Sequence, residues 1–156
     1  MIQRPQSLYL CALLVICLML ILGDIVYFKA SNSDKSESVN IEYDETELIA
    51  ADGTSKQQNT LLISLLASIG AIATIAIFLF KNRKMQTLLS SVNYLFILGL
   101  ILIMYMASYR IGFFEQETEG LTFYALMPVA LLFFNFLAIR GITKDEKLIR
   151  SMDRLR

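Results

Sequence analysis

The sequence predicts an all-α membrane protein: an antiparallel bundle of four transmembrane helices with a short cytoplasmic amphipathic helix at the C-terminus. Two observations lead to this fold class. Hydrophobic residues make up 56 % of the 156 residues and charged residues 18 %, whereas soluble domains average about 45–50 % and about 25 %. The hydrophobic residues also gather in four runs of about 20 residues, the length of a helix that crosses a bilayer.

The predicted spans are residues 8–28, 60–80, 88–109 and 121–139, which together form a single membrane domain. The last three runs carry no charge, and the first is interrupted only by Gly23 and Asp24. The first run is longer than the core of a secretory signal, about 7–15 residues, and no cleavage site follows it. It is therefore read as a retained helix, with Pro5 in its first turn.

The distribution of basic residues predicts the orientation of the spans. Ten of the fourteen Lys and Arg residues lie in the N-terminus, in the connection after residue 80 or beyond residue 139. Basic residues favour the cytoplasmic side, so both termini of this multi-pass protein are predicted to be cytoplasmic. Eleven of the fourteen acidic residues fall on the opposite side.

Residues 29–59 are predicted to form an acidic extracytoplasmic loop. Two interpretations stay open for residues 41–49, a short strand or hairpin and a solvated loop, and Asp52-Gly53 is a turn signal. Residues 115–120 are predicted to form a plain loop. The acids Asp44, Glu45, Glu47 and Asp52 do not match the ligand spacing of an EF-hand, so no metal site is predicted.

Four polar residues are candidates for contacts within the membrane. Asn93 and Asn135 are predicted to lie at one depth near the cytoplasmic end and to bond to each other or to the backbone. They act either as structural contacts between helices or as the lining of a small cavity. Asp24 lies near the outer end of the first span, with Arg110 as a candidate partner and Lys29 as another. Pro128 is predicted to bend the fourth span.

Several classes of function receive no support from the composition. Without histidine there is no imidazole base and no histidine metal site, so the chain is not predicted to be an enzyme or to hold a cofactor. Zero net charge gives no electrostatic support for nucleic-acid binding. Cys11 and Cys17 lie on different faces of one helix and cannot pair within it.

The C-terminal tail is predicted to be a separate helix over residues 143–156. Thr143 and Glu146 have the spacing of a capping box, and Gly141 suits the end of the fourth span. Leu148, Ile149, Met152 and Leu155 would form the apolar face of this helix.

Two stretches of the chain resemble one known family. Met1-Ile2-Gln3-Arg4 with Gln6 and Tyr9-Leu10, and residues 140–151 with 153–156, are similar to the terminal signatures of domain of unknown function 4293. This resemblance implies a small bacterial four-helix protein of the inner membrane and implies no activity. It highlights a candidate partner surface on the cytoplasmic side, made of Gln3, Arg4, Lys144, Asp145, Glu146, Arg150, Asp153 and Arg154.

The sequence therefore favours a non-enzymatic accessory module that binds another membrane protein or a protein at the cytoplasmic face. The alternative is a small oligomeric transporter or channel. The expected partners are the lipid bilayer and either a second membrane protein or further copies of the chain, with no nucleic acid.

Overall fold

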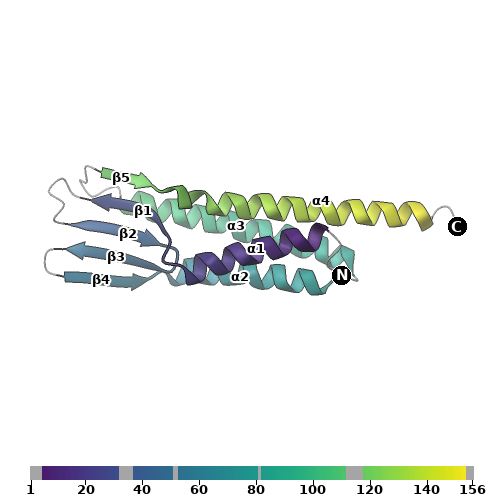
Figure 1. The fold of residues 1–156 in the computed structure, drawn as a ribbon, viewed down its shortest axis with the longest axis horizontal. Helices are drawn as coiled ribbons and strands as arrows, with labels where there is room; N and C mark the ends of the chain where they lie inside the picture. Colours follow the sequence, from purple (N-terminus) through teal and green to yellow (C-terminus); the bar gives the residue numbers. More distant parts are fainter. Residues whose placement is uncertain (1–4, 32–36, 51–52, 81, 112–117, 154–156) are drawn as a thin grey trace.

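The structure is a computed structural model that describes residues 5–31, 37–50, 53–80, 82–111 and 118–153. Four helices pack side by side, and a five-stranded antiparallel sheet lies at one end of them (Figure 1). α1 begins and α4 ends at the far end from the sheet. The prediction of an all-α fold is therefore wrong, because two of the connections between helices contribute strands.

The four helices differ in their capacity to cross a membrane. α1 spans Pro5–Leu22, α2 Thr60–Phe78, α3 Arg83–Ile111 and α4 Met127–Asp153. Among the described residues, three apolar helical stretches are long enough to cross: Thr60–Phe78, Arg83–Tyr109 and Phe123–Leu148. The stretch in α1, Gln6–Leu22, is shorter. The prediction of four transmembrane helices is corrected to three helices of sufficient length.

The first helix ends earlier than predicted for a physical reason. At Gly23 a Cβ atom would lie 2.7 Å from the carbonyl oxygen of Met19, and Asp24 then places a charge in the apolar run. The β-branched and aromatic residues that follow, Val26, Tyr27 and Phe28, favour a strand. Residues 26–28 therefore belong to the sheet and do not extend the span to residue 28.

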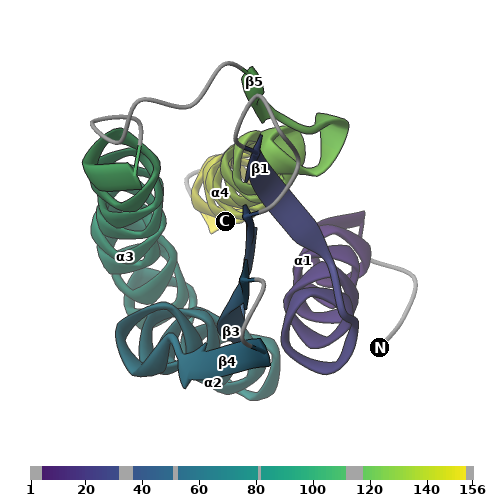
Figure 2. The same cartoon turned by 90° about the vertical axis from the view of Figure 1, so that its left-hand side faces the viewer.

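Each helix contacts two neighbours. α1 packs against α2 and α4, and α3 packs against the same two helices. Viewed from the sheet end, the four helices are arranged in a ring (Figure 2). Their inward faces are lined by buried apolar residues such as Leu13, Leu66, Ile97 and Leu131, so the helices enclose one core.

Two predictions about α4 are wrong. The helix is continuous through Gly141, and the Thr143 hydroxyl donates to the carbonyl oxygen of Ile139 instead of capping a new helix. Pro128 is the second residue of α4, after the 3₁₀ turn η1 (Phe123–Leu126). Its missing N–H therefore costs no helical bond. By contrast, Pro5 is the first residue of α1, in agreement with its predicted place.

The sheet has the strand order β4-β3-β2-β1-β5. β1 spans Val26–Ser31, β2 Ser38–Glu42, β3 Glu45–Ala50, β4 Gly53–Gln58 and β5 Thr118–Leu121. The strand interpretation of residues 41–49 is thus the right one of the two that stayed open. A hairpin joins β3 to β4 at the predicted turn, where Ala50 pairs with Gly53, whose φ is 139°. The prediction of a plain loop over residues 115–120 is wrong for its described part, which lies in β5.

Hydrogen bonds fix the sheet to the helices. Tyr27 and Tyr43 are fully buried with ring centroids 5.0 Å apart, and the Tyr43 hydroxyl donates to the carbonyl oxygen of Tyr124 at 2.8 Å. On the α2 side, the Asn59 backbone N–H donates to the carbonyl oxygen of Asp44. The Asn59 amide nitrogen donates to the carbonyl oxygen of Glu42 at 2.9 Å. The sheet is therefore attached through β1 and β2 and through the start of α2.

Candidate functional site

The helical core contains a layer of uncharged polar side chains in the half that is distant from the sheet. Its members come from three helices and are all at most 1 % exposed: Gln6, Gln86, Ser90, Asn93 and Asn135. The amide nitrogen of Asn135 donates to the carbonyl oxygen of Ser90 at 2.9 Å. This is one of the two kinds of contact expected for Asn135, a bond to the backbone.

Most polar atoms of this layer have no hydrogen-bond partner. They are both side-chain atoms of Gln6 and of Asn93, together with Gln86 Oε1, Ser90 Oγ and Asn135 Oδ1. Buried polar atoms in proteins normally find a partner. The layer is therefore the part of the helical core that is best suited to bind water or a small polar solute.

Gly141 allows α4 to approach α1 closely beside this polar layer. A Cβ atom at Gly141 would lie 3.2 Å from the Cβ atom of Gln6. A side chain at position 141 would therefore press α4 away from α1. The glycine that the sequence suggested as a helix end serves instead to allow this close approach.

The structure places Asp24 outside the helices, where it lies beside two other acids. A carboxylate oxygen from each of Asp24, Glu42 and Asp44 lies within 4.8 Å of the others. We call these three residues the junction cluster, because they lie where β1 and β2 meet the helices. The side chain of Arg110, the predicted partner of Asp24, is outside the described residues, and Lys29 is exposed on β1.

The junction cluster was not predicted, because its members are far apart in the sequence. The antiparallel pairing of Val26 with Glu42 brings the end of β2 next to Asp24. Glu42 is only 7 % exposed, and burial raises the pKa of its carboxyl, with further increases from Asp44 and Asp24. The sequence offered one signal for Asp24: its charge interrupts the first apolar run, as expected of a residue between the end of α1 and the start of β1.

The sheet has an open edge at β4. Every residue of this strand is exposed, and β4 is the last strand in the order. A groove of about 550 Å³ runs between the end of β4, the start of α2 and the end of α3. Its described lining residues are Gln57, Gln58, Asn59, Thr60, Leu61, Leu62, Ile103, Met106 and Ala107. An unpaired strand edge is therefore continuous with a partly apolar groove.

One ion-pair group lies on the face of β3 and β4. Lys56 on β4 pairs with Glu45 and Glu47 on β3. The hydrogen bond from its ammonium to Glu45 raises the pKa of Lys56. These two acids are thus partly neutralised, whereas the junction cluster has no comparable ion pair within the described part of the chain.

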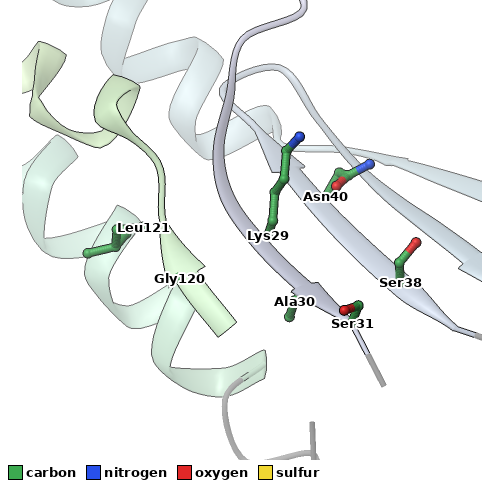
Figure 3. Close-up of a pocket in the computed structure, with 7 residues that line it drawn as sticks. All are labelled: Lys29, Ala30, Ser31, Ser38, Asn40, Gly120 and Leu121. Atoms are coloured by element: carbon green, nitrogen blue, oxygen red, sulfur yellow. The ribbon is translucent and has the colours of Figure 1, made fainter. Parts of the chain in front are cut away.

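A second depression, of about 400 Å³, lies over β1, β2 and β5. Lys29 and Asn40, which pair across β1 and β2, stand on the same face of the sheet there, and Ser38 stands beside them (Figure 3). The depression is shallow and offers one cationic group among its described lining residues, so it does not enclose a ligand.

The predicted cytoplasmic partner surface is only partly described. Lys144 is exposed and Asp145 and Glu146 are half-buried, in the C-terminal part of α4. The C-terminal end of α4 extends beyond the other helices (Figure 1). The side chains of Arg150 and Asp153 and the whole of Arg4 and Arg154 lie outside the described residues, as does Gln3. That these residues form one surface stays a prediction.

A family model for a domain of unknown function (DUF4293) matches residues 2–155. The chain belongs to the DUF4293 family. The match covers the terminal stretches that carried the resemblance except Met1 and Arg156, and it covers the whole sheet, so the strands are part of the DUF4293 domain. No curated protein and no solved structure matches the chain.

Proposed function

We propose that this DUF4293 protein is a membrane-embedded accessory module that binds another membrane protein through the open edge of β4. The observation that carries this proposal is the continuity of the edge with the groove beside α3. An exposed edge strand offers unpaired N–H and C=O groups to an extended segment of a partner. The groove would accept apolar side chains from the same segment.

The charge of the sheet end indicates the chemistry of the partner. Residues 24–58 and 110–121 hold eleven acidic and four basic residues. Complementary charge favours association and suppresses wrong partners. We infer that the partner segment is extended, adjoins a membrane span, and combines basic residues with apolar ones.

The orientation of the protein is part of this proposal. The basic tail and the basic connection between α2 and α3 lie at the end opposite to the sheet, which favours a cytoplasmic position for that end. The sheet would then be extracytoplasmic. In a variant without Cys11 and Cys17, an impermeant thiol reagent on intact cells should label Ser55→Cys and leave Lys147→Cys unlabelled. The reverse labelling would invert the orientation.

The docking proposal is tested by filling the groove. Native mass spectrometry of the protein from its own membrane should show a second membrane protein in fixed ratio. Ala107→Phe, which fills the groove, should remove this partner. The matched control is Leu102→Phe, because Leu102 is 59 % exposed on the same helix and does not line the groove. A complex that survives Ala107→Phe, or a chain found only with its own copies, would reject the proposal.

The polar layer of the helical core favours a second candidate function, a small oligomeric transporter of polar solutes. Its unpartnered amide and hydroxyl groups are suited to replace the water around such a solute. Vesicles that contain the protein should then show solute flux that Asn93→Leu and Asn135→Leu reduce. The absence of flux, or flux that is unchanged in both variants, would remove this candidate.

A further inference from the structure

We propose that Asp24, Glu42 and Asp44 form a binding site for a divalent cation of the size of calcium at the junction between the sheet and the helices. This inference is independent of the docking proposal, because it rests on residues beside β1 and β2 and not on the edge strand β4.

The three carboxylates favour calcium over magnesium. Their nearest oxygens all lie within 4.8 Å of one another, and they come from three different segments of the chain. Calcium takes six to eight oxygens at about 2.3–2.6 Å in flexible geometry. Magnesium requires a near-ideal octahedron at about 2.0–2.1 Å and usually keeps several waters. A set of three carboxylates from separate segments therefore suits calcium better.

The second observation is that Glu42, one of the three acids, is a buried residue whose carboxylate takes part in none of the side-chain hydrogen bonds or ion pairs of the described residues. It is 7 % exposed. Oδ1 of Asp44 is buried and also lacks a partner. An unpaired buried carboxylate is costly unless a proton, a donor or a cation satisfies it. One carboxylate oxygen of each of the three acids lies within 4.8 Å of those of the other two, so a cation between them would contact all three.

The protein supplies no cation of its own to this volume within its described residues. Of the two described lysines of the sheet, Lys56 on β4 is paired with Glu45 and Glu47, and Lys29 on β1 is exposed. No described Lys or Arg forms an ion pair with a member of the junction cluster. A soluble divalent ion is therefore the group that neutralises the three charges, and water completes its coordination.

A bound cation would join three segments of the chain. Asp24 belongs to the connection between α1 and β1, Glu42 ends β2, and Asp44 lies in the turn before β3. Asn59 already connects the last two of these residues to α2 through backbone oxygens. The cation would add α1 to this junction and so fix the sheet with respect to both helices.

Terbium provides a direct test, because it replaces calcium and emits when a nearby aromatic ring is excited. The chain has no tryptophan, and Tyr43 lies between Glu42 and Asp44 in the sequence. In a non-ionic detergent, excitation of tyrosine should give saturable terbium emission from the wild-type protein. Calcium chloride should displace the terbium at lower concentration than magnesium chloride does.

The variants decide whether the junction cluster is the site. Glu42→Gln and Asp24→Asn should each weaken terbium binding at least tenfold, whereas the matched control Asp145→Asn, at the opposite end, should bind as the wild type does. Asp24 is exposed, so Asp24→Asn gives the result even if Glu42→Gln does not fold. Unsaturable emission, equal binding in Asp24→Asn and wild type, or stronger displacement by magnesium would each overturn the proposal.

Discussion

The helical core and the sheet of this protein contain polar groups of different kinds. In the helices, the buried polar side chains are amides and hydroxyls, and they carry no charge. In the junction cluster, where the sheet meets the helices, the buried residue is the acid Glu42, which lies beside two further acids. An uncharged group in a core can be satisfied by a helix backbone or by water, but a cluster of like charges requires a counterion. The comparison indicates that the uncharged polar layer of the helices requires only neutral partners, whereas the acids beside the sheet require a proton or a cation.

The largest expected effect comes from separating the two regions. Tyr43→Ala removes a fully buried ring that packs on Tyr27 and a hydroxyl that bonds to the carbonyl oxygen of Tyr124. Loss of such a ring costs about 3–5 kcal/mol of stability. Hydrogen exchange should show loss of protection in the sheet and retained protection in α2 and α3. Equal loss in both regions would mean that they unfold as one unit. Tyr43→Phe, which removes only the hydroxyl, should cost about 1 kcal/mol.

The next effect is confined to the helical core. Gly141→Leu introduces a side chain where even a Cβ atom lies 3.2 Å from Gln6. Overpacking of this kind costs about 1–3 kcal/mol, measured as the free energy of unfolding in mild detergent. Gly99→Leu is the control, because nothing lies within 4 Å of a Cβ atom at that position. Equal destabilisation by the two substitutions would show that α1 and α4 do not depend on this contact.

The pH dependence of stability should distinguish the two regions, because the acid among the described buried residues is Glu42, where the sheet meets the helices. Burial and the neighbouring Asp44, Asp24, Glu45 and Glu47 raise the pKa of Glu42 in the folded protein. The folded protein therefore holds this proton more tightly than the unfolded chain does. Stability should fall as the pH rises from the ordinary pKa of glutamate to the raised value.

This dependence is measured as the thermal unfolding temperature in the presence of a chelator. Glu42→Gln should flatten the curve over that pH interval, whereas Asp145→Asn should leave it unchanged. A curve for Glu42→Gln that still falls as steeply as that of the wild type would assign the titration to another group.

A smaller effect is expected from Asn135→Leu. The substitution removes the hydrogen bond to the carbonyl oxygen of Ser90, and such contacts between membrane helices contribute about 0.6 kcal/mol on average. The leucine also adds apolar contact, which offsets part of this loss. A loss above about 2 kcal/mol would show that Asn135 holds a larger polar network together.

The smallest effect is expected at the exposed ion pairs of the sheet. Lys56→Ala removes the pairs with Glu45 and Glu47 on a solvent-exposed face, where water and salt screen the attraction between charges. The unfolding temperature should change little, and the change should disappear in high salt. A large, salt-independent loss would mean that Lys56 also supports the hairpin by packing.

The sequence was sufficient to locate most of the helices, since apolar runs of the right length and without charge are a local signal. α2 lies within the predicted run 60–80, and α3 extends beyond its predicted run at both ends. α4 begins at Met127, later than the predicted residue 121, and extends beyond the predicted end because polar residues continue the helix. The sheet was harder to predict. The first residues of β1 belong to the apolar run 8–28, so they could not be distinguished from a transmembrane helix. Acids such as Glu45 and Glu47 in β3 have low strand propensity.

The strand pairing and the junction cluster depend on long-range contacts that leave no local pattern. Alternation of Val39, Ile41 and Tyr43, all of which are buried, was the strongest available sign of β2. The pairing of β1 with β5, in which Phe28 pairs with Leu121, could not be predicted from a local pattern of residues, because the two strands are far apart in the sequence. Glu42 was overlooked for the same reason, because it approaches Asp24 only when β1 and β2 are paired.

The strand order has a consequence for how the protein is made at the ribosome. β1 to β4 emerge before α2, but β5 emerges only after α2 and α3 have both been synthesised. Since β5 pairs with β1, the sheet cannot reach its full width while the α2–α3 hairpin is still missing. During synthesis the outer edge of β1 stays open until that hairpin is complete. Pairing of β5 with β1 therefore completes the sheet, and α4, which emerges after β5, packs against α1 and α3 later.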